Sequence, residues 1–447
     1  AVGYSGSTMT YTDAPNAQER MNEFLGHLEK HDIPCQSFHL SSGYTSIGDK
    51  RYVFNWNHEK FPNIKGFIEH YRQAGIELVP NIKPAFLMDH PHYAMLAKRG
   101  WFIQDKNGNP TLSQFWGEVG SHLDFTQPEA ATWWREQVKQ QLLEMGIRST
   151  WNDNNEYEIW DQTALVNGFG SPYSATITRP IHSLLMMRAS RQAQVANRPN
   201  ARPYVVTRSG MAGLHRYAQT WSGDNITSWE TLRFNQKMGI SLAMCGISNS
   251  GHDIGGFAGP APSPELLIRW VQAGLLMPRF SIHSWNSDGT VNEPWMFPEV
   301  TALIAKLMRL RRALQPFIHH LLWRYHQFYE PISLPLWFQY PSFNAAWNDN
   351  DAMLLGTNVL TISAMDPNIT ELDVVLPPGY WWDVRDGRRY DGGRQCSLAS
   401  PLDTLPPTLV CENSGILIDS APAGFKSHPP LSLSLIHISE PTRRRGI

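Results

Sequence analysis

The chain of 447 residues is too long for one ordinary domain, but it is long enough for a barrel of about 250–300 residues and a smaller module. Its 38 basic and 40 acidic residues nearly cancel, and no basic stripe stands out. This balance argues against nucleic acid or an anionic membrane surface as a partner. No apolar run reaches the roughly 18 residues that a transmembrane helix needs, so no membrane-spanning segment is predicted.

The four cysteines are far apart in the sequence, at Cys35, Cys245, Cys396 and Cys411. Their spacing matches no metal-binding or disulfide framework, so all four are predicted to be free thiols. Free thiols favour a reducing compartment, such as the cytoplasm, only slightly. The chain opens at Ala1 without a methionine, so we expect it to be a fragment, and the lack of a signal peptide says nothing about secretion.

Strand-like and helix-like segments alternate from the N-terminus onward. The predicted strands cover residues 3–6, 35–40, 76–83, 151–156, 204–208, 219–224, 247–253 and 279–285. Helical periodicity recurs between them, at roughly 177–195, 229–245 and 264–277, and a long amphipathic helix covers about 298–325. Eight strands that alternate with helices predict a (β/α)8 TIM barrel over residues 1–328.

The pattern changes after Pro331. Short alternating segments at 334–339, 352–360, 371–376 and 415–420 are broken by proline, glycine and Asn-Asp. They predict an antiparallel β-sandwich domain over residues 329–425, which has no cluster of polar residues and therefore a supporting role. Residues 426–447 fit neither domain and resemble a translated sequencing adapter, so they are predicted to be a non-native or disordered tail.

Polar residues gather where the predicted barrel strands end. Asp153, Arg208, Asp224, Asp253 and His283 each lie at or just beyond the end of a strand. TIM-barrel enzymes build their active sites at the carboxyl ends of the strands. Carboxylates at the exit of a buried strand are also costly to desolvate, so they usually have a function.

Two of these carboxylates have the surroundings expected of a pair that acts on a sugar. Asp153 follows Trp151 by two residues, and Asp224 follows Trp221 by three. Cleavage of a glycoside needs one carboxyl group at the anomeric carbon and another that protonates the leaving oxygen. A single aspartate at a strand end is more often a helix cap or a turn residue. Two of them on one rim, each beside tryptophan, predict a catalytic pair.

Several motifs, taken in order, resemble glycoside hydrolase family 31, the retaining α-glycosidases related to α-glucosidase and α-xylosidase. Trp151-Asn152-Asp153-Asn154-Asn155-Glu156 is similar to the nucleophile motif of the family, and Trp221-Ser222-Gly223-Asp224-Asn225 is similar to its acid/base motif. Segments 208–217, 251–257 and 123–128 resemble further family signatures. The resemblance covers about residues 1–425, and it implies that the N-terminal β-sandwich of the family is missing here.

The resemblance implies a role for each matching residue. Asp153 is expected to be the nucleophile and Asp224 the general acid/base, with no metal and no cofactor. Burial against Trp221 and the nearby Asp153 carboxylate are expected to keep the acid protonated. The residues expected to bind or enclose the sugar are Arg208, Asp253, His283, Trp221, Trp116, Phe257, Trp151 and Ser41.

Ser41 marks a departure from the family. Many of its α-glucosidases carry an aspartate after the second barrel strand, and that aspartate binds the far hydroxyls of glucose. The matching place here is Ser41-Ser42-Gly43-Tyr44, which has no carboxylate. The substrate is therefore expected to be a glucoside, an α-galactoside or an α-N-acetylgalactosaminide.

Three alternatives to a retaining glycoside hydrolase remain open at this point. The chain is an α-transglycosylase if a second sugar replaces water, and it is a non-catalytic carbohydrate-binding relative if turnover is absent. A barrel metallohydrolase would instead use His252, Asp253 and His283, although no further ligand has a suitable spacing. Each of the three gives a different outcome when an aryl α-glycoside is offered with and without a chelator.

Overall fold

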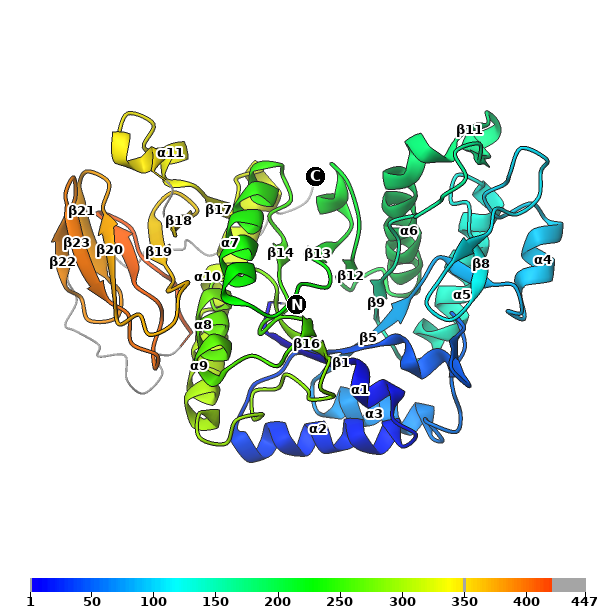
Figure 1. Cartoon of the computed structure of the whole chain (residues 1–447), viewed down its shortest axis with the longest axis horizontal. Coiled ribbons are helices and arrows are strands. Elements are labelled where there is room, and N and C mark those ends of the chain that lie inside the picture. Colours follow the sequence, from blue (N-terminus) through cyan, green and yellow to red (C-terminus); the bar gives the residue numbers. More distant parts are fainter. Residues whose placement is uncertain (1, 349–350, 420–447) are drawn as a thin grey trace, which may run out of the picture.

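The computed structural model describes residues 2–348 and 351–419, and its centre is a barrel of parallel strands (Figure 1). The barrel strands are β1 (Tyr4–Thr8), β2 (Ser37–Leu40), β5 (Glu77–Ile82), β9 (Ser149–Asn152), β12 (Tyr204–Thr207), β13 (Gln219–Trp221), β14 (Ser250–Gly251) and β16 (Phe280–Asn286). From β1 to β14 each barrel strand pairs with the next in chain order, and β16, the last, pairs with β1. This confirms the predicted (β/α)8 architecture.

The ring closes between the segment after β14 and β16. Asp253 forms a parallel bridge with Ser281, and the Ile254 N–H donates to the Ser281 carbonyl at 2.8 Å. The short strand β15 (Ala258–Gly259) adds to the outer end of β16. Because β14 itself is only two residues long, this bridge is what joins the two edges of the sheet.

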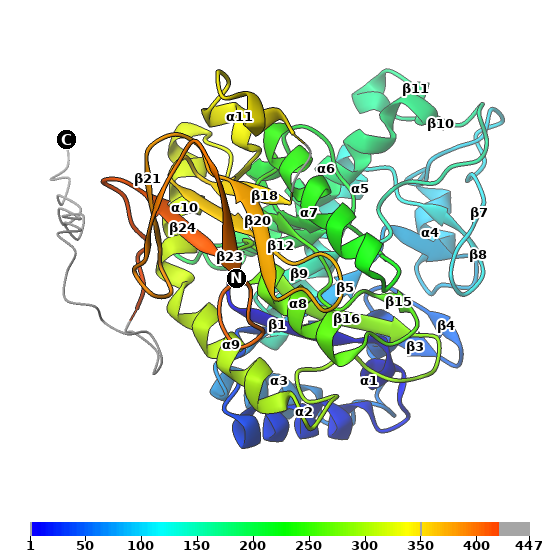
Figure 2. The same cartoon turned by 60° about the vertical axis from the view of Figure 1, so that its left-hand side comes forward.

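Helices surround the barrel on the outside (Figures 1 and 2). They are α2 (Ala17–His31), α3 (Ile64–Gln73), α5 (Pro128–Gln141), α6 (Ala175–Asn197), α7 (Trp229–Met244), α8 (Pro264–Gly274), α9 (Thr301–Ala313) and α10 (Gln315–Phe328). Side chains cap the starts of α3, α7 and α8; in α8 the Ser263 hydroxyl accepts from the Leu266 N–H, and Pro264 fills the first turn. Between β12 and β13, residues 208–218 form a loop with one 3₁₀ turn instead of an α-helix.

The interior of the barrel is filled by buried side chains below its rim, both apolar ones and polar ones such as Ser5, Ser37 and Arg279. Val79, Trp151, Val206 and Trp221 form one buried cluster, in which the two indole rings meet edge to face at 5.6 Å. Large side chains from alternate strands fill TIM barrels in this way, so the barrel is a packed core and not a pore. Chemistry is therefore confined to the carboxyl ends of the strands.

The register of the strands decides which polar residues become neighbours. Asn152 pairs with Thr207 on one side and with Ile82 on the other. The residues that follow, Asp153, Arg208 and Lys83, therefore leave the sheet at the same level. In the same way, the pairing of Trp221 with Gly251 brings the next residues, Ser222 and His252, side by side.

Two excursions form a lobe beside the barrel, on the right in Figure 1. The first contains a small sheet of β6 (Ala85–Leu87), β7 (Ser113–Gln114) and β8 (Val119–His122) together with α4 (Tyr93–Lys98). The second is the hairpin of β10 (Leu165–Val166) and β11 (Tyr173–Ser174). The shorter elements α1 (Met9–Asp13), β3 (Ser46–Ile47) and β4 (Lys50–Arg51) lie in the loops after β1 and β2. The lobe carries Trp116 in the turn between β7 and β8.

An antiparallel β domain follows the barrel, on the left in Figure 1. Its six-stranded sheet has the order β17-β18-β19-β24-β21-β22, and β20 pairs with β23 in a second layer. The strands are β17 (Ser333–Leu334), β18 (Ala352–Leu355), β19 (Val359–Ile362), β20 (Glu371–Val375), β21 (Tyr380–Asp383), β22 (Arg389–Asp391), β23 (Gln395–Ala399) and β24 (Thr408–Cys411). Side chains from both layers, including Trp381 and Leu398, share one buried cluster. The predicted sandwich is confirmed.

Several local predictions for this half of the chain are wrong. The expected strand at 334–339 stops at Pro335, which has no N–H to give to a ladder, and α11 (Leu336–Gln339) follows. No strand covers residues 415–419, and Ser420 and the predicted 426–447 tail lie outside the described residues. The expected helix at 298–325 is two helices separated at Leu314, because Pro316 in the first turn of α10 cannot donate to a preceding turn.

Main-chain carbonyls join the two domains. Arg269, which is buried on α8, donates to the carbonyl of Ile369 and, at 3.0 Å, to that of Ser400. Gln272, one turn later, donates to the carbonyls of Pro401 and Thr404, both at 2.8 Å. We call these contacts the α8 joint; they fix the β domain against the outside of the barrel.

Two global features complete the description. All four cysteines are free, as predicted. No helix in the described part of the chain has both the length and the apolarity that crossing a bilayer requires.

Candidate active site

Asp153 follows β9 directly and is almost fully buried. Its Oδ2 atom accepts from Asn81 Nδ2 at 2.8 Å and from Lys83 Nζ at 2.9 Å. Its Oδ1 atom has no hydrogen-bond partner among the described residues. Burial by itself would raise the pKa of Asp153, but Lys83 and Arg208, with the Asn81 hydrogen bond, outweigh it and hold the pKa at about 2. The group is therefore an ionised carboxylate with one oxygen held and one free.

Arg208 connects the candidate catalytic residues. It follows β12, where the register places it beside Asp153, and its Nε donates to Glu156. Its Nη1 lies 3.8 Å from Asp153 Oδ1 and donates to Asp224 Oδ1 and Oδ2 at 3.0 and 2.9 Å. These carboxylates raise the pKa of Arg208 even though burial alone would lower it.

The shared nitrogen brings Asp153 and Asp224 together at one rim of the barrel. Both carboxylates lie within 4.0 Å of Arg208 Nη1. Glycosidases work with two carboxyl groups that are about 5–9.5 Å apart, and this arrangement is compatible with that range. Asp153 and Asp224 were predicted at the ends of separate strands, and in the structure both lie next to Arg208 Nη1.

The expected burial of Asp224 against Trp221 is wrong. The Asp224 side chain is 41% exposed, whereas Trp221 lies inside the barrel against Trp151. The reason is local, because Gly223 has a φ of +80° and turns the chain outward between the two residues. Asp224 thus stands on the rim, where Arg208 is its charged partner.

Asp253 and His283 lie deeper in the site. Asp253 is fully buried, and its Oδ1 accepts from Arg279 Nη1 at 3.1 Å while its Oδ2 has no partner among the described residues. Burial raises the pKa of Asp253 to about 7, although Arg279 opposes the shift. Burial likewise lowers the pKa of His283 to about 3, which makes it a neutral imidazole with an unpartnered Nδ1.

Aromatic rings surround His283. Trp151 meets it edge to face at 5.3 Å, and Phe257 lies 4.8 Å from it. The indole N–H groups of Trp151 and Trp221 are buried and have no acceptor among the described residues. Buried donors and acceptors without partners, next to aromatic faces, are what a site for sugar hydroxyls and apolar sugar faces requires.

Trp116 lies at the outer edge of the site. It is 58% exposed and packs on Trp285 with a ring separation of 4.9 Å. Trp285 follows His283 by two residues on β16, and its indole is exposed as well. Trp116 is therefore part of an exposed pair at the rim, and Trp285 was not among the predicted residues.

Ser41 follows β2 and is completely buried. Its Oγ has no hydrogen-bond partner among the described residues, and neither ring nitrogen of the nearby His39 has one. The His39 ring packs against Trp151 at 5.6 Å. Ser41 follows His39 by two residues, so both side chains point to the same face of the sheet.

Three functional residues were missed from sequence. Asn81 and Lys83 hold Asp153, and Glu156 holds Arg208. The first two end a strand that the sequence predicts, so their place at the carboxyl end of a barrel strand was the available signal. Glu156 lay within the nucleophile motif, but its partner depended on the path of the loop, where Asn154 and Tyr157 adopt positive φ angles.

The residues of the metallohydrolase alternative have other partners. His252 Nδ1 lies 2.9 Å from the Ser222 hydroxyl, and Asp253 binds Arg279. Within residues 2–348 and 351–419, no three histidine, cysteine, aspartate or glutamate side chains are grouped as metal ligands would be. In these ranges, His252, Asp253 and His283 are therefore not arranged as a set of metal ligands.

Comparison with known proteins identifies relatives that are similar to this chain in sequence. Alpha-glucosidase 2 of Bacillus thermoamyloliquefaciens is 30% identical over 91% of this chain and 52% of its own length. Human neutral alpha-glucosidase C is 30% identical over 91% of this chain and 45% of its own. The chain thus spans about half the length of the curated relatives that it matches.

Solved structures share the fold. A Flavobacterium johnsoniae GH31 dextranase complexed with glucose superposes with a TM-score of 0.83 at 24% identity, covering 93% of this chain and 52% of the other. A GH31 alpha-xylosidase from a soil metagenome complexed with xylose gives 0.80 at 23% identity, covering 93% and 63%. Residues 1–321 match the model of the glycosyl hydrolases family 31 TIM-barrel domain, and residues 329–414 match that of the family 31 C-terminal domain. The chain therefore belongs to glycoside hydrolase family 31.

Proposed function

We propose that this chain carries the catalytic centre of a retaining α-glycosidase that removes terminal α-linked sugars by double displacement. Asp153 is the nucleophile and Asp224 is the general acid/base. The relatives it matches are named as α-glucosidases, so glucose or a close analogue is the proposed sugar class.

The observation that carries the proposal is the difference between the two oxygens of Asp153. A carboxylate with a purely structural role pairs both oxygens when it is buried. Here Oδ2 is held by Asn81 and Lys83, whereas Oδ1 is left without a partner and is directed to the side where Arg208 Nη1 lies 3.8 Å away. A pKa of about 2 keeps the group charged at neutral pH. This is the state that a nucleophile needs.

The reaction takes two steps. In the first, Asp153 Oδ1 forms a bond to the anomeric carbon while the bond to the leaving oxygen breaks and Asp224 gives that oxygen its proton. In the second, Asp224 takes a proton from water, whose oxygen attacks the same carbon and releases Asp153. Two inversions at one carbon retain the α configuration.

The contact between Arg208 and Asp224 must change when a sugar binds. An acid that protonates a leaving group works best without a cation against its oxygens. We therefore assign Arg208 to hydroxyls of the bound sugar, which replace Asp224 as partners of Nη1 while Glu156 keeps Nε in place. The buried atoms that still lack partners in Asp253, His283 and Ser41 would bind further hydroxyls.

Transfer to a second sugar is a further candidate outcome of the same chemistry. The exposed Trp116–Trp285 pair lies at the rim, where it would give an acceptor sugar a ring to stack on. An acceptor held there competes with water in the second step. Hydrolysis and transfer then differ only in which hydroxyl Asp224 deprotonates.

A trapping experiment tests the proposal. The full chain is incubated with a 5-fluoro α-glycosyl fluoride, which slows the second step, and its peptides are analysed by mass spectrometry. We expect one glycosyl group on the peptide that carries Asp153, and proton NMR of an aryl α-glycoside digest should show the α anomer first. A label elsewhere, or the β anomer as first product, would contradict the assignment.

A further inference from the structure

A line of hydrogen bonds joins the residues on either side of Asp224 to the segment after β14. The Ser222 hydroxyl donates to Asn225 Oδ1 and lies 2.9 Å from His252 Nδ1. The Asn225 carbonyl in turn accepts from the N–H groups of Phe257 and Ala258, at 2.8 and 3.1 Å. The loop that carries Asp224 is thus tied to the segment after β14 on both sides of the aspartate.

The direction of these bonds fixes the protonation of His252. Burial, with a further contribution from Arg279, lowers the pKa of His252 to about 3, so the ring is neutral and carries one proton. The Ser222 hydroxyl gives its proton to Asn225, and its oxygen therefore needs a donor. That donor is the Nδ1–H of His252, which leaves Nε2 as an acceptor.

The Nε2 atom faces helix α7, where the Asn235 main-chain carbonyl is near the ring, but it makes no well-formed hydrogen bond among the described residues. A Cβ atom on Gly239 of this helix would lie 3.3 Å from it, so only a glycine leaves the ring ample room there. Asn235, one turn earlier on α7, is 1% exposed, and neither its Oδ1 nor its Nδ2 has a partner in the described chain.

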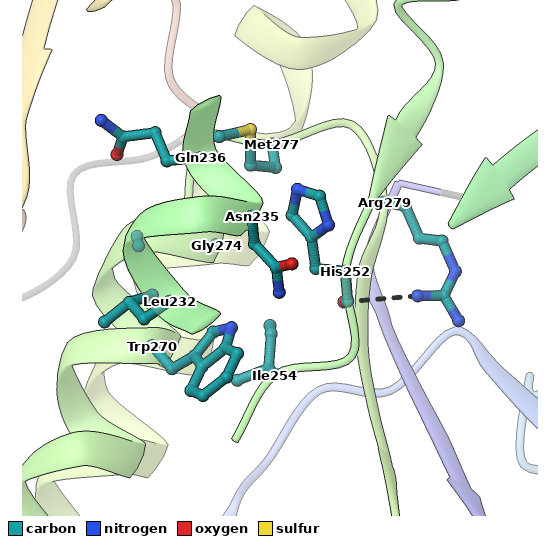
Figure 3. A pocket seen from close by; sticks show the side chains of 10 residues that line it. Leu232, Asn235, Gln236, His252, Ile254, Trp270, Gly274, Met277 and Arg279 are labelled. Carbon is teal, nitrogen blue, oxygen red and sulfur yellow. Dashed lines mark hydrogen bonds between the residues drawn. The ribbon is translucent and has the colours of Figure 1, made fainter. Parts of the chain in front are cut away.

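Asn235 and His252 line the same small cavity (Figure 3). Its volume is about 20 Å³, and its other walls are mainly apolar, formed by Leu232, Ile254, Trp270 and Met277 among others. In Figure 3 the His252 ring lies on the α7 side of its strand, and Arg279 lies on the opposite side. A single water needs roughly 10–15 Å³ and two or more polar partners, and this cavity supplies both.

We propose that His252 is a positioning residue for the acid/base Asp224 and that a water bound in this cavity holds it. Asn235 donates to the water, the water to His252 Nε2, Nδ1 to Ser222, and Ser222 to Asn225. The inference rests on the proposed function, because it needs Asp224 to be the acid. It explains how an exposed aspartate after a flexible glycine keeps its place when a sugar withdraws Arg208.

His252 does not act on the sugar directly in this scheme. Nδ1 faces Ser222 and Nε2 faces α7, so both ring nitrogens are engaged away from Asp153. Its sequence neighbour Asp253 differs, because that carboxylate is held by Arg279 and not by Ser222 or α7. His252 therefore positions the loop of Asp224, whereas Asp253 is proposed to bind the sugar.

The test compares two substrates that differ in their need for an acid. A glycosyl fluoride leaves with little protonation, whereas a methyl glycoside requires it. We propose to measure kcat/KM of the full chain for α-D-glucosyl fluoride and methyl α-D-glucoside, or for the galactosyl pair if that sugar is turned over faster. If a substitution impairs only the general acid, kcat/KM for the methyl glycoside falls much more than kcat/KM for the glycosyl fluoride.

For His252→Phe we expect a loss of about 10–100-fold with the methyl glycoside, the range that a displaced catalytic group produces, and about threefold or less with the fluoride. His252→Asn keeps a donor close to the Nδ1 position and should recover most of the loss. Ser222→Ala interrupts the same line without disturbing the core, and Asn235→Leu removes the partner of the water. Both variants should lose more activity with the methyl glycoside than with the fluoride, and the loss should be smaller in Asn235→Leu than in Ser222→Ala.

Two results overturn the inference. One is an equal loss with both substrates in folded His252→Phe and Ser222→Ala variants, which indicates a general structural role. The other is no loss with either substrate. Asp224→Ala is measured alongside: if it shows no preference for the fluoride, the proposed function itself fails, and that outcome is distinct from a failure confined to His252. If His252→Phe does not fold, Ser222→Ala decides.

Discussion

The ends of β9 and β13 hold their aspartates in opposite ways. Asp153 is buried, with Asn81 and Lys83 on one oxygen, and the barrel register alone brings these partners together. Asp224 is half exposed, follows a glycine turn and has Arg208 as its charged partner. The sheet thus preorganises the candidate nucleophile, whereas the candidate acid depends on a loop and on what supports that loop.

The largest effect should come from removing the group that the sheet holds. Asp153→Ala should lower kcat for an aryl α-glycoside on the order of 10⁶-fold, as loss of the nucleophile of a serine protease does. The matched control is Asp383→Asn, since Asp383 is also a buried carboxylate, paired with Arg385 at 2.6 Å in the β domain. It should alter stability and leave kcat unchanged. Comparable activity losses in both variants would remove the distinction between the two regions.

Lys83→Met should weaken the same region without deleting the nucleophile. The pKa of Asp153 is held at about 2 in part by Lys83, so its loss must raise that pKa. Because the carboxylate has to be ionised, activity falls as pH drops through this pKa, and the acid limb of the kcat/KM profile should move to higher pH.

At neutral pH we expect the Lys83→Met variant to lose about 10–100-fold through the misplaced carboxylate. Lys306→Met removes a surface lysine that pairs with Asp403 and should change neither the limb nor the rate. An unshifted acid limb in Lys83→Met would mean that Lys83 does not set the charge of Asp153.

Ser41→Asp tests whether the residue that follows β2 determines which sugar is preferred as substrate. A buried hydroxyl without a partner is a tolerant neighbour, whereas a carboxylate demands hydroxyls in fixed places. We expect a shift of about tenfold toward glucosides in a panel of aryl α-glycosides that differ at C2, C4 and C6. Ser41→Ala should lower all rates together. Unchanged ratios in Ser41→Asp would dissociate Ser41 from sugar choice.

The smallest effect is expected at the open rim. Trp285→Ala should raise KM for a disaccharide about two- to fivefold with little change in kcat, because it removes binding that is equal in the ground and transition states. Trp323→Ala, an equally exposed tryptophan on α10 that stacks on His320, is the matched control and should leave KM unchanged. A fall in kcat would instead place Trp285 nearer the chemistry.

Local periodicity in the sequence is enough to predict the order of the strands. It also predicts the main catalytic candidates, because they lie at strand ends. Asp153, Arg208 and Asp224 end strands whose apolar runs are plain, so their common rim follows from the barrel. Lys83 was visible as a strand end, but its contact with Asp153 required the pairing of Ile82 with Asn152, which no local pattern contains.

Other failures have equally local causes. The exposure of Asp224 depends on the positive φ of Gly223, and the break at Leu314 on a proline two residues further on. In the β domain, turns and strands alternate within a few residues, so the predicted segment 352–360 turned out to be two strands, β18 and β19, joined at Gly356. The segments there are too short for a hydrophobic period to define where each strand begins and ends.

The α8 joint has a consequence for how this family can vary. Arg269 and Gln272 recognise carbonyl oxygens of residues 369 and 400–404, and every amino acid carries such an oxygen whatever its side chain. Apart from Ser400, whose hydroxyl also accepts from Arg269 at 3.1 Å, the side chains of this loop can therefore change while the attachment persists. The sequence requirement of the α8 joint therefore falls mainly on Arg269 and Gln272, and the ion pairs of Arg233 with Asp351 and Asp366 form a second connection between the two halves of the molecule.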